Sequence, residues 1–89
     1  MKRIICDFNL FDMNQVISVM NDDGTISTSI SSTMDSLAHD IVDLCHSEHI
    51  NKVHLCGNEK YAYQAILPSI LEYNKSTYGI DNIEIEVVS

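Results

Sequence analysis

The chain has 89 residues, a length that fits one domain rather than two. Hydrophobic residues make up 45% of it, which is ordinary for a folded protein and too high for a disordered one. It has no apolar run of about 18 residues, so a membrane-spanning helix is excluded. Asp7 interrupts the N-terminal apolar run before a signal-peptide core forms. We therefore expect a single cytoplasmic domain over residues 1–89, without membrane association.

Acidic residues outnumber basic ones, 13 against 5, which gives a net charge of −8. This sign argues against direct nucleic-acid binding, which needs a Lys/Arg footprint, and suits a soluble protein or one with a basic protein partner. The three cysteines are odd in number and lack C-x-x-C spacing, and each lies in an apolar run: Cys6, Cys45 and Cys56. We expect buried free thiols in a reducing compartment.

Three strands are expected in the first third of the chain. Runs of β-forming residues predict them over residues 3–9, 15–20 and 25–30, with a connection at 10–14 and a turn at 21–24. Asp23-Gly24 favours a type I′ hairpin turn, because this pair tolerates the positive φ angles that the turn needs.

A two-residue loop at Asp23-Gly24 fixes the register of the hairpin. It pairs Val19 with Thr28 and Ile17 with Ile30, so the two faces of the hairpin differ sharply. One face carries Ile17, Val19, Ile26, Thr28 and Ile30, and the other carries Ser18, Ser27 and Ser29. This division is typical of an antiparallel sheet with one buried face.

A helix is expected after the hairpin, with Ser32 or Thr33 as its N-cap and its end near Glu48. Apolar residues recur at helical spacing along its inner stripe: Met34, Leu37, Ala38, Ile41, Leu44 and Cys45. Its other face is expected to be solvated and carries Asp35, His39, Asp40, Asp43 and His46.

A second helix–strand unit completes the chain. Residues 52–56 predict a strand that ends at Gly57, and Asn58 is a candidate cap for the helix that follows. The inner stripe of that helix is Ala62, Ala65, Ile66, Ile70 and Tyr73. Pro68 should kink or split the helix, Gly79 should end it, and the alternation over residues 83–87 predicts the last strand.

The resulting order is β-β-β-α-β-α-β, an α/β fold with a five-stranded mixed sheet. Because parallel crossovers are right-handed, the strand order is expected to be 3-2-1-4-5, with both helices on one face. The other face stays open and is mostly polar. It is expected to present Asp7, Asn9, Ser18, Ser27, Ser29, His54, Glu84 and Glu86, with Ile5, Val16, Met20 and Cys56 among them.

This element order resembles a truncated ribonuclease-H-like fold, the superfamily of the RuvC-type resolvases and the actin-like ATPases. Asp7, within Ile-Ile-Cys-Asp-Phe-Asn, fits the first-strand aspartate of those nucleases. The resemblance implies a second acid on or near the fourth strand, where Glu59 is the nearest candidate. It also implies a third acid from a C-terminal helix, which this chain lacks, and the glycine-rich phosphate loop of the ATPases is missing. The segment Asp-Phe-Asn-Leu-Phe-Asp-Met-Asn is similar in texture to small bacteriophage proteins.

Several polar groups are candidate sites on the expected sheet. Asp7, His54, Glu84 and Glu86 carry ligands suited to Mg²⁺ or Mn²⁺, although side chains two strands apart are about 10 Å from each other. Solvent-facing polar residues are the simpler interpretation.

Cys45, His46 and His49 suggest zinc, but Cys45 belongs to the apolar stripe and no second Cys/His pair stands at finger-like spacing. Cys56 and His54 are a candidate nucleophile and base, but no third group is visible to orient the histidine.

The connection at residues 10–14 is unusual because it carries large apolar residues. Phe11 either packs against the core edge or, with Asp12 and Met13, forms a contact loop for a partner or a second subunit.

Our leading hypothesis from the sequence is a non-enzymatic, phage-encoded assembly protein without a cofactor, in the host cytoplasm. We expect it to self-associate or to bind a protein, a basic one in the more specific version, through its open face: Phe11, Asp12, Met13, Asp7, Asn9, His54, Glu84 and Glu86. The alternative is a minimal ribonuclease-H-like nuclease in which Asp7 binds Mg²⁺ or Mn²⁺.

Overall fold

The computed structural model describes residues 2–9, 13–57 and 62–88. Five strands form a single sheet: β1 (Arg3–Phe8), β2 (Asn14–Met20), β3 (Ile26–Thr33), β4 (Lys52–Gly57) and β5 (Glu84–Val88). Two helices, each joined to a shorter helical turn, complete the fold: η1 (Met34–Ser36), α1 (Leu37–Ser47), α2 (Ala62–Tyr73) and η2 (Asn74–Tyr78). None of the helices in the described part of the chain is long and apolar enough to span a membrane.

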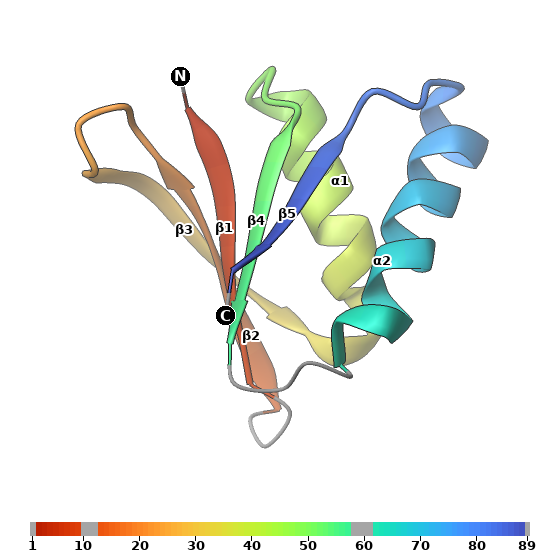
Figure 1. Cartoon of the computed structure of the whole chain (residues 1–89), viewed down its shortest axis with the longest axis horizontal. Coiled ribbons are helices and arrows are strands. Elements are labelled where there is room, and N and C mark those ends of the chain that lie inside the picture. Colours follow the sequence, from red (N-terminus) through yellow and green to blue (C-terminus); the bar gives the residue numbers. More distant parts are fainter. Residues whose placement is uncertain (1, 10–12, 58–61, 89) are drawn as a thin grey trace.

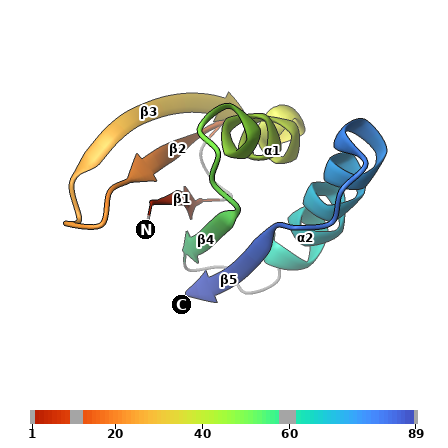
Figure 2. The ribbon, with the colours of Figure 1, turned by 90° about the horizontal axis from the view of Figure 1, so that it is seen from above.

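The strand order is β3-β2-β1-β4-β5, which confirms the expected topology. β2 pairs antiparallel with both β1 and β3, while β4 runs parallel to β1 and β5 runs parallel to β4. Both helices lie on the same face of the twisted sheet (Figures 1 and 2), as two right-handed crossovers in one direction require. No helix of the described residues lies over the opposite face.

The core lies between the sheet and the two helices. Alternate residues of the central strands point into it, and α1 contributes the largest helical share. Its fully buried side chains include Ile4, Cys6, Ile17, Val19, Leu37, Ile41, Val42, Val53, Leu55 and Ile70. The two periodicities in the sequence, 2 for strands and 3.6 for helices, account for this set.

The hairpin between β2 and β3 reaches the expected register by a different route. Only Gly24 has a positive φ in this turn, and the amide of Asn21 donates to the carbonyl of Thr25 at 2.8 Å, so the loop has three residues instead of two. A type I′ turn is therefore wrong. The added loop residue is offset by Ser27, which is skipped in β3 between the pairs Met20–Ile26 and Val19–Thr28. The expected pairs of Val19 with Thr28 and of Ile17 with Ile30 are confirmed.

The expected burial of the β3 isoleucines is wrong. Ile26 is 49% exposed and Ile30 is 36% exposed. Beyond the bulge Ile26 pairs with Met20, so its side chain lies on the open face of the sheet. Ile30 pairs with the buried Ile17 on the core face, but on the outermost strand, which curves away from the helices at its hairpin end (Figure 2). The alternation in sequence therefore marked the correct face for Thr28 and Ile30 but not for Ile26, which the bulge moves to the other face.

The first helix begins later than the sequence predicts. β3 continues to Thr33 and η1 follows it, so α1 starts at Leu37. Thr33 occupies the N-cap position of η1 as expected, but no side-chain hydrogen bond caps η1 or α1. Ser32 is buried and its hydroxyl donates to Asp40 Oδ2 at 2.5 Å, which ties the end of β3 to α1.

Pro68 does not split the second helix, which was one of the two expected effects. α2 runs through it without interruption, and Pro68 is exposed. The irregularity comes later, where the helix widens into the π-helical turn η2 and ends at Gly79, which has a φ of 71°. Gly79 therefore ends the helix as expected. The proposed cap at Asn58 lies outside the described residues.

Gln15 links the ends of β1 and β2 through its side chain. Its Nε2 donates to the carbonyl of Asn9 at 2.7 Å, and its Oε1 accepts from the amide of Asn9 at 2.8 Å. Gln15 is 1% exposed, so this pairing satisfies polar groups that have lost water. It holds Asn9 and the end of β1 against β2, next to the position of Asp7.

We expect Gln15→Ala to lower the free energy of unfolding by about 1–3 kcal/mol, because it removes both hydrogen bonds at a buried position. Urea denaturation measures the change. The exposed neighbour Asn14 provides the matched control, since Asn14→Ala should change stability by less than about 0.5 kcal/mol. Equal effects of the two substitutions would contradict a stabilising role for the Gln15 pairing.

Candidate functional site

The open face of the sheet is ordered into three rows that cross the strands. The register places a charged row near the start of β1, a mixed row in the middle and a third row toward the end of β1. From β1 to β5, the first row is Arg3, Lys52 and Glu84. From β2 to β5, the second row is Ser18, Ile5, His54 and Glu86. From β2 to β4, the third row is Val16, Asp7 and Cys56.

Asp7 is an exposed carboxylate on the central strand of the open face, near the end of that strand. β1 is the central strand, and Asp7 lies directly opposite Val16 of β2 and Cys56 of β4. Its two immediate cross-strand neighbours are therefore uncharged. His54 is its diagonal neighbour, because it pairs with Ile5, two residues earlier on β1. Such diagonal positions are about 7–8 Å apart.

His54 and Glu86 form a contact of their own across β4 and β5. His54 Nε2 lies 3.2 Å from Glu86 Oε2, and the two residues line a shallow cavity of about 160 Å³ with Lys52, Glu84 and Ile85. Glu86 is on the second strand from β1 and one row away from Asp7. At about 4.8 Å between neighbouring strands, that separation is too large for one metal ion to bridge the two carboxylates.

Among the described residues, no group of three or more His, Cys, Asp or Glu side chains is placed to hold a metal ion. The face thus brings His54 and Glu86 together and leaves Asp7 apart from the β5 acids. Asn9 is exposed, and its backbone is bound to Gln15. Of the expected contact loop, Met13 is 86% exposed, while Phe11, Asp12 and the candidate second acid Glu59 lie outside the described residues.

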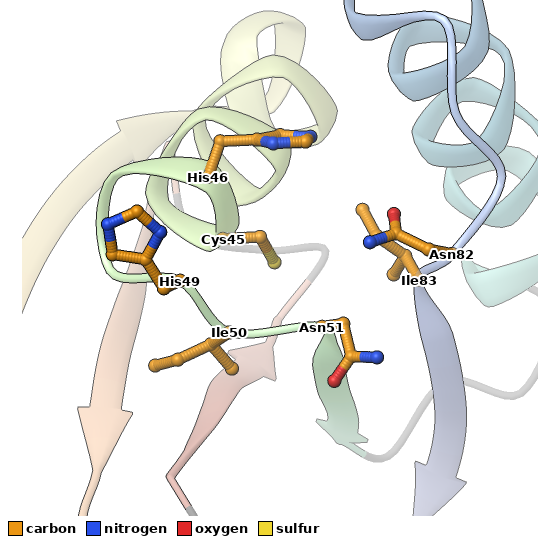
Figure 3. A pocket seen from close by; sticks show the side chains of 7 residues that line it. All are labelled: Cys45, His46, His49, Ile50, Asn51, Asn82 and Ile83. Atoms are coloured by element: carbon orange, nitrogen blue, oxygen red, sulfur yellow. The ribbon is translucent and has the colours of Figure 1, made fainter.

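The sulfur and imidazole groups near the end of α1 do not form a zinc site. They line a pocket of about 260 Å³ with Ile50, Asn51, Asn82 and Ile83, and His46 and His49 point in different directions there (Figure 3). Burial raises the pKa of the Cys45 thiol to about 12, which disfavours the thiolate that zinc needs. His46 Nε2 is already hydrogen-bonded to Asn74 Oδ1 at 2.7 Å.

Cys56 is likewise poorly suited to be a nucleophile. Burial, and next the negative charge of Asp7, raise the pKa of its thiol. A cysteine nucleophile needs a lowered pKa, because the thiolate is the reactive form. His54, two residues earlier on the same strand face, is engaged with Glu86 instead. The structure therefore gives no support to a Cys56–His54 pair.

A cluster of aromatic and polar side chains joins α1 to α2 and η2, where the sequence predicted a solvated helix face. His39 stacks on Tyr73 with ring centroids 4.1 Å apart, and His46 stacks on Tyr78 at 3.6 Å. Asp43 Oδ1 accepts hydrogen bonds from the Tyr73 hydroxyl at 2.9 Å and the Tyr78 hydroxyl at 2.7 Å. Polar residues at α-helical spacing on α1 gave the signal, but their partners come from about 30 residues later in the chain.

The strand order and the two helices on one side match a ribonuclease-H-like fold. Among solved structures, the chain is similar to RuvC from Thermus thermophilus, with a TM-score of 0.67 and 8% identity. That match covers 99% of this chain and 63% of RuvC, so the chain spans less than two thirds of that protein. It is also similar to RNase H1 from the halophilic archaeon Halobacterium salinarum NRC-1, with a TM-score of 0.60 and 12% identity, over 98% of this chain and 84% of the enzyme.

At this level of identity the two similarities establish the fold and leave the activity open. No model of a known protein family matches the chain, and no curated protein matches it.

We expect stability at alkaline pH to depend on Tyr78. The hydrogen bond to Asp43 is the main cause that raises the pKa of Tyr78 to about 12, followed by desolvation and the charge of Asp43. The folded protein therefore retains a proton that the unfolded chain loses near pH 10. The contribution of this hydroxyl to the free energy of unfolding is fully present below about pH 10 and is lost as the pH rises toward 12.

The measurement compares urea denaturation of the wild type and of Tyr78→Phe between pH 8 and about pH 11.5. The wild type should lose more stability over this range, because the variant lacks the titrating hydroxyl. The buried thiols, also raised in pKa, contribute equally to both proteins. Parallel stability curves would show that the bond from Tyr78 to Asp43 does not stabilise the fold.

Proposed function

We propose that the protein is a metal-dependent nuclease in which Asp7 binds the catalytic divalent cation. The observation that carries this proposal is the position of Asp7, an exposed carboxylate on the open side of the central strand of a ribonuclease-H-like sheet. Two of its solved structural neighbours are a RuvC and an RNase H1.

The donor chemistry at Asp7 suits Mg²⁺ or Mn²⁺. These hard cations prefer oxygen ligands, and Mg²⁺ is commonly held by only one or two carboxylates, together with water and substrate phosphates. Uncharged cross-strand neighbours leave the approach to Asp7 open, and Asn9 follows it at the end of β1. When bound, the cation would supply a polarised phosphoryl oxygen and an activated water. Asp7 would hold the cation, and the surface beside β1 would receive the nucleic-acid strand.

The net charge of −8 sets the conditions for such an activity. Repulsion between the protein and phosphates keeps affinity low, and a divalent cation at Asp7 reduces this repulsion where the strand approaches. We therefore expect metal and nucleic acid to bind together more tightly than either binds alone. This coupling reconciles an acidic surface with a nucleic-acid substrate.

The test is cleavage of single-stranded and duplex DNA, RNA and RNA–DNA hybrids with Mg²⁺ or Mn²⁺, for the wild type and Asp7→Asn. The substitution keeps the size of the side chain and removes its charge, so cleavage should fall at least about 100-fold. Asp35→Asn is the matched control, because Asp35 is an exposed acid in η1 on a different part of the surface.

A loss of cleavage in Asp7→Asn alone would support the proposal. Equal cleavage by all three proteins would point to a contaminating nuclease, and no cleavage by the wild type under these conditions would also overturn the proposal. Circular dichroism of the variants checks that they are folded.

A second candidate function is protein binding through the same open face. It is favoured by the exposed apolar side chains there: Val16 is 53% exposed in the row of Asp7, and Met13 precedes β2. Uncovered apolar groups beside acidic ones suit a partner with basic and apolar residues. Under this proposal Asp7 contributes charge rather than metal chemistry.

An amphipathic Lys/Arg-rich peptide provides a defined probe for this second candidate. NMR titration should shift resonances of the open face, at Val16, Asp7 and His54, while those of α1 stay unchanged, and added salt should weaken the binding. Shifts spread over the whole acidic surface would contradict a specific site. Asp7→Asn should reduce peptide affinity only a few-fold, in contrast to its expected effect on cleavage.

A further inference from the structure

The outer edge of β3 carries no charge, in contrast to the opposite edge of the sheet. All eight residues from Ile26 to Thr33 are uncharged, and none is proline, in a chain with 18 charged residues, 13 acidic and 5 basic. In the described part of the chain, β3 pairs with β2 on one side and is the last strand on the other. Its outward backbone groups therefore form the edge of the sheet.

The other edge of the same sheet has the usual protection against strand pairing. β5 has only five residues, and two of them, Glu84 and Glu86, are exposed acids. Short length and charged side chains discourage edge-to-edge association in natural sheets, and β3 has neither. The bulge at Ser27 lies near its hairpin end and leaves residues 28–33 in regular pairing with β2. The contrast between the two edges points to β3 as a surface that pairs with another strand.

Exposed apolar side chains accompany this edge. Ile26 and Ile30 are partly uncovered on β3, and Met34 follows in η1 with 37% exposure. Ile30 lies on the core face and Ile26 on the open face, so both faces of this edge strand carry uncovered apolar surface. A strand added at this edge would bury them and extend the sheet.

We propose that this edge is a homodimer interface, in which β3 of one copy pairs antiparallel with β3 of a second copy. Two identical antiparallel strands are related by a two-fold axis, so the assembly closes as a dimer instead of growing into a fibre. Charge decides in favour of a second copy as the occupant. A chain with a net charge of −8 repels its copies over most surfaces, and an uncharged strand is where two copies can meet without opposing like charges.

Acidic residues at the two ends of β3 should make the stability of this dimer depend on salt concentration. Asp22 and Asp23 lie in the hairpin before the strand, and Asp35 lies in η1 just after it. Antiparallel pairing brings the hairpin end of one protomer toward the η1 end of its partner, where these acids repel each other. Salt should therefore strengthen the dimer, whereas it would weaken binding of a basic partner to the acidic surface.

The experiment is sedimentation analysis over about 10–500 µM protein, because an interface restricted to one strand edge is small and weak. The wild type should change from monomer to dimer over this range, and raising NaCl from about 50 to 500 mM should shift the change to lower concentration. Ile30→Lys places a positive charge from each copy in the interface, and the repulsion should raise the dissociation constant about tenfold or more. Val87→Lys is the matched control on the β5 edge, where the residue is 44% exposed, and should leave the dissociation constant unchanged.

Hydrogen exchange of the wild type provides a second measurement that does not depend on the folding of a variant. With rising protein concentration, amides of β3 should gain protection while those of β5 do not. A wild type that stays monomeric to 500 µM at both salt concentrations would overturn the proposal. Equal weakening of the dimer by both lysine substitutions would also overturn it, as would a gain of amide protection at β5 on dimerisation. The outcome is independent of cleavage, so it does not depend on the proposed nuclease function.

Discussion

The structure depends on the pairing of β1 with two strands of opposite direction. β1 is antiparallel to β2 on one side and parallel to β4 on the other, so it joins the hairpin half of the sheet to the crossover half. Ile4 and Cys6 are fully buried on its inner face, beneath the helices. The buried position of Cys6 raises its pKa to about 12, which keeps the thiol neutral within the core. A strand paired on both sides and buried on one face has little freedom of register.

The position of the candidate site follows directly from this constraint. Because side chains alternate along a strand, burial of Ile4 and Cys6 requires Ile5 and Asp7 to face the other way. Both crossovers proceed in the same direction, so the helices cover the face of Ile4 and leave the face of Asp7 open. The exposed carboxylate on the central strand is thus a consequence of the topology. No particular loop conformation is needed to present it.

Much of this could be predicted from the sequence because the decisive signals are local and periodic. Alternation in the strands and the stripe of α1 depend on residues a few positions apart, and they predicted the strand order, the pairing of Val19 with Thr28 and the open face. The predicted hairpin loop was one residue too short, yet Ile17 and Val19 have the predicted partners. Both are buried and need partners that face the core. Ser27 absorbs the difference as a bulge in β3.

The sequence could not predict features that depend on distant partners. Asp43 looked like a solvated residue because the two tyrosines that donate to it lie 30 and 35 positions later, and nothing in the local spacing reveals where a second helix will pack. The exposure of Ile26 and Ile30 was not predicted either, because the bulge at Ser27 moves Ile26 to the open face and Ile30 lies on the outermost strand. Single-sequence patterns give the direction of a side chain more readily than the identity of what covers it.

The distribution of charge connects the two surfaces that the fold leaves uncovered. Uniform negative charge would oppose a phosphate backbone and a second copy of the chain alike, so any association needs a local exception. The chain provides two exceptions of different kinds. At Asp7 a divalent cation would reverse the sign of the local charge, whereas along β3 the charge is simply absent over eight residues. These surfaces lie at the centre of the sheet and at its edge, separated by β2, so a dimer joined through β3 would leave both copies of Asp7 accessible. In such a dimer the sheet would continue across the two-fold axis as ten strands, twice the five of one copy, with the two carboxylates related by the same axis.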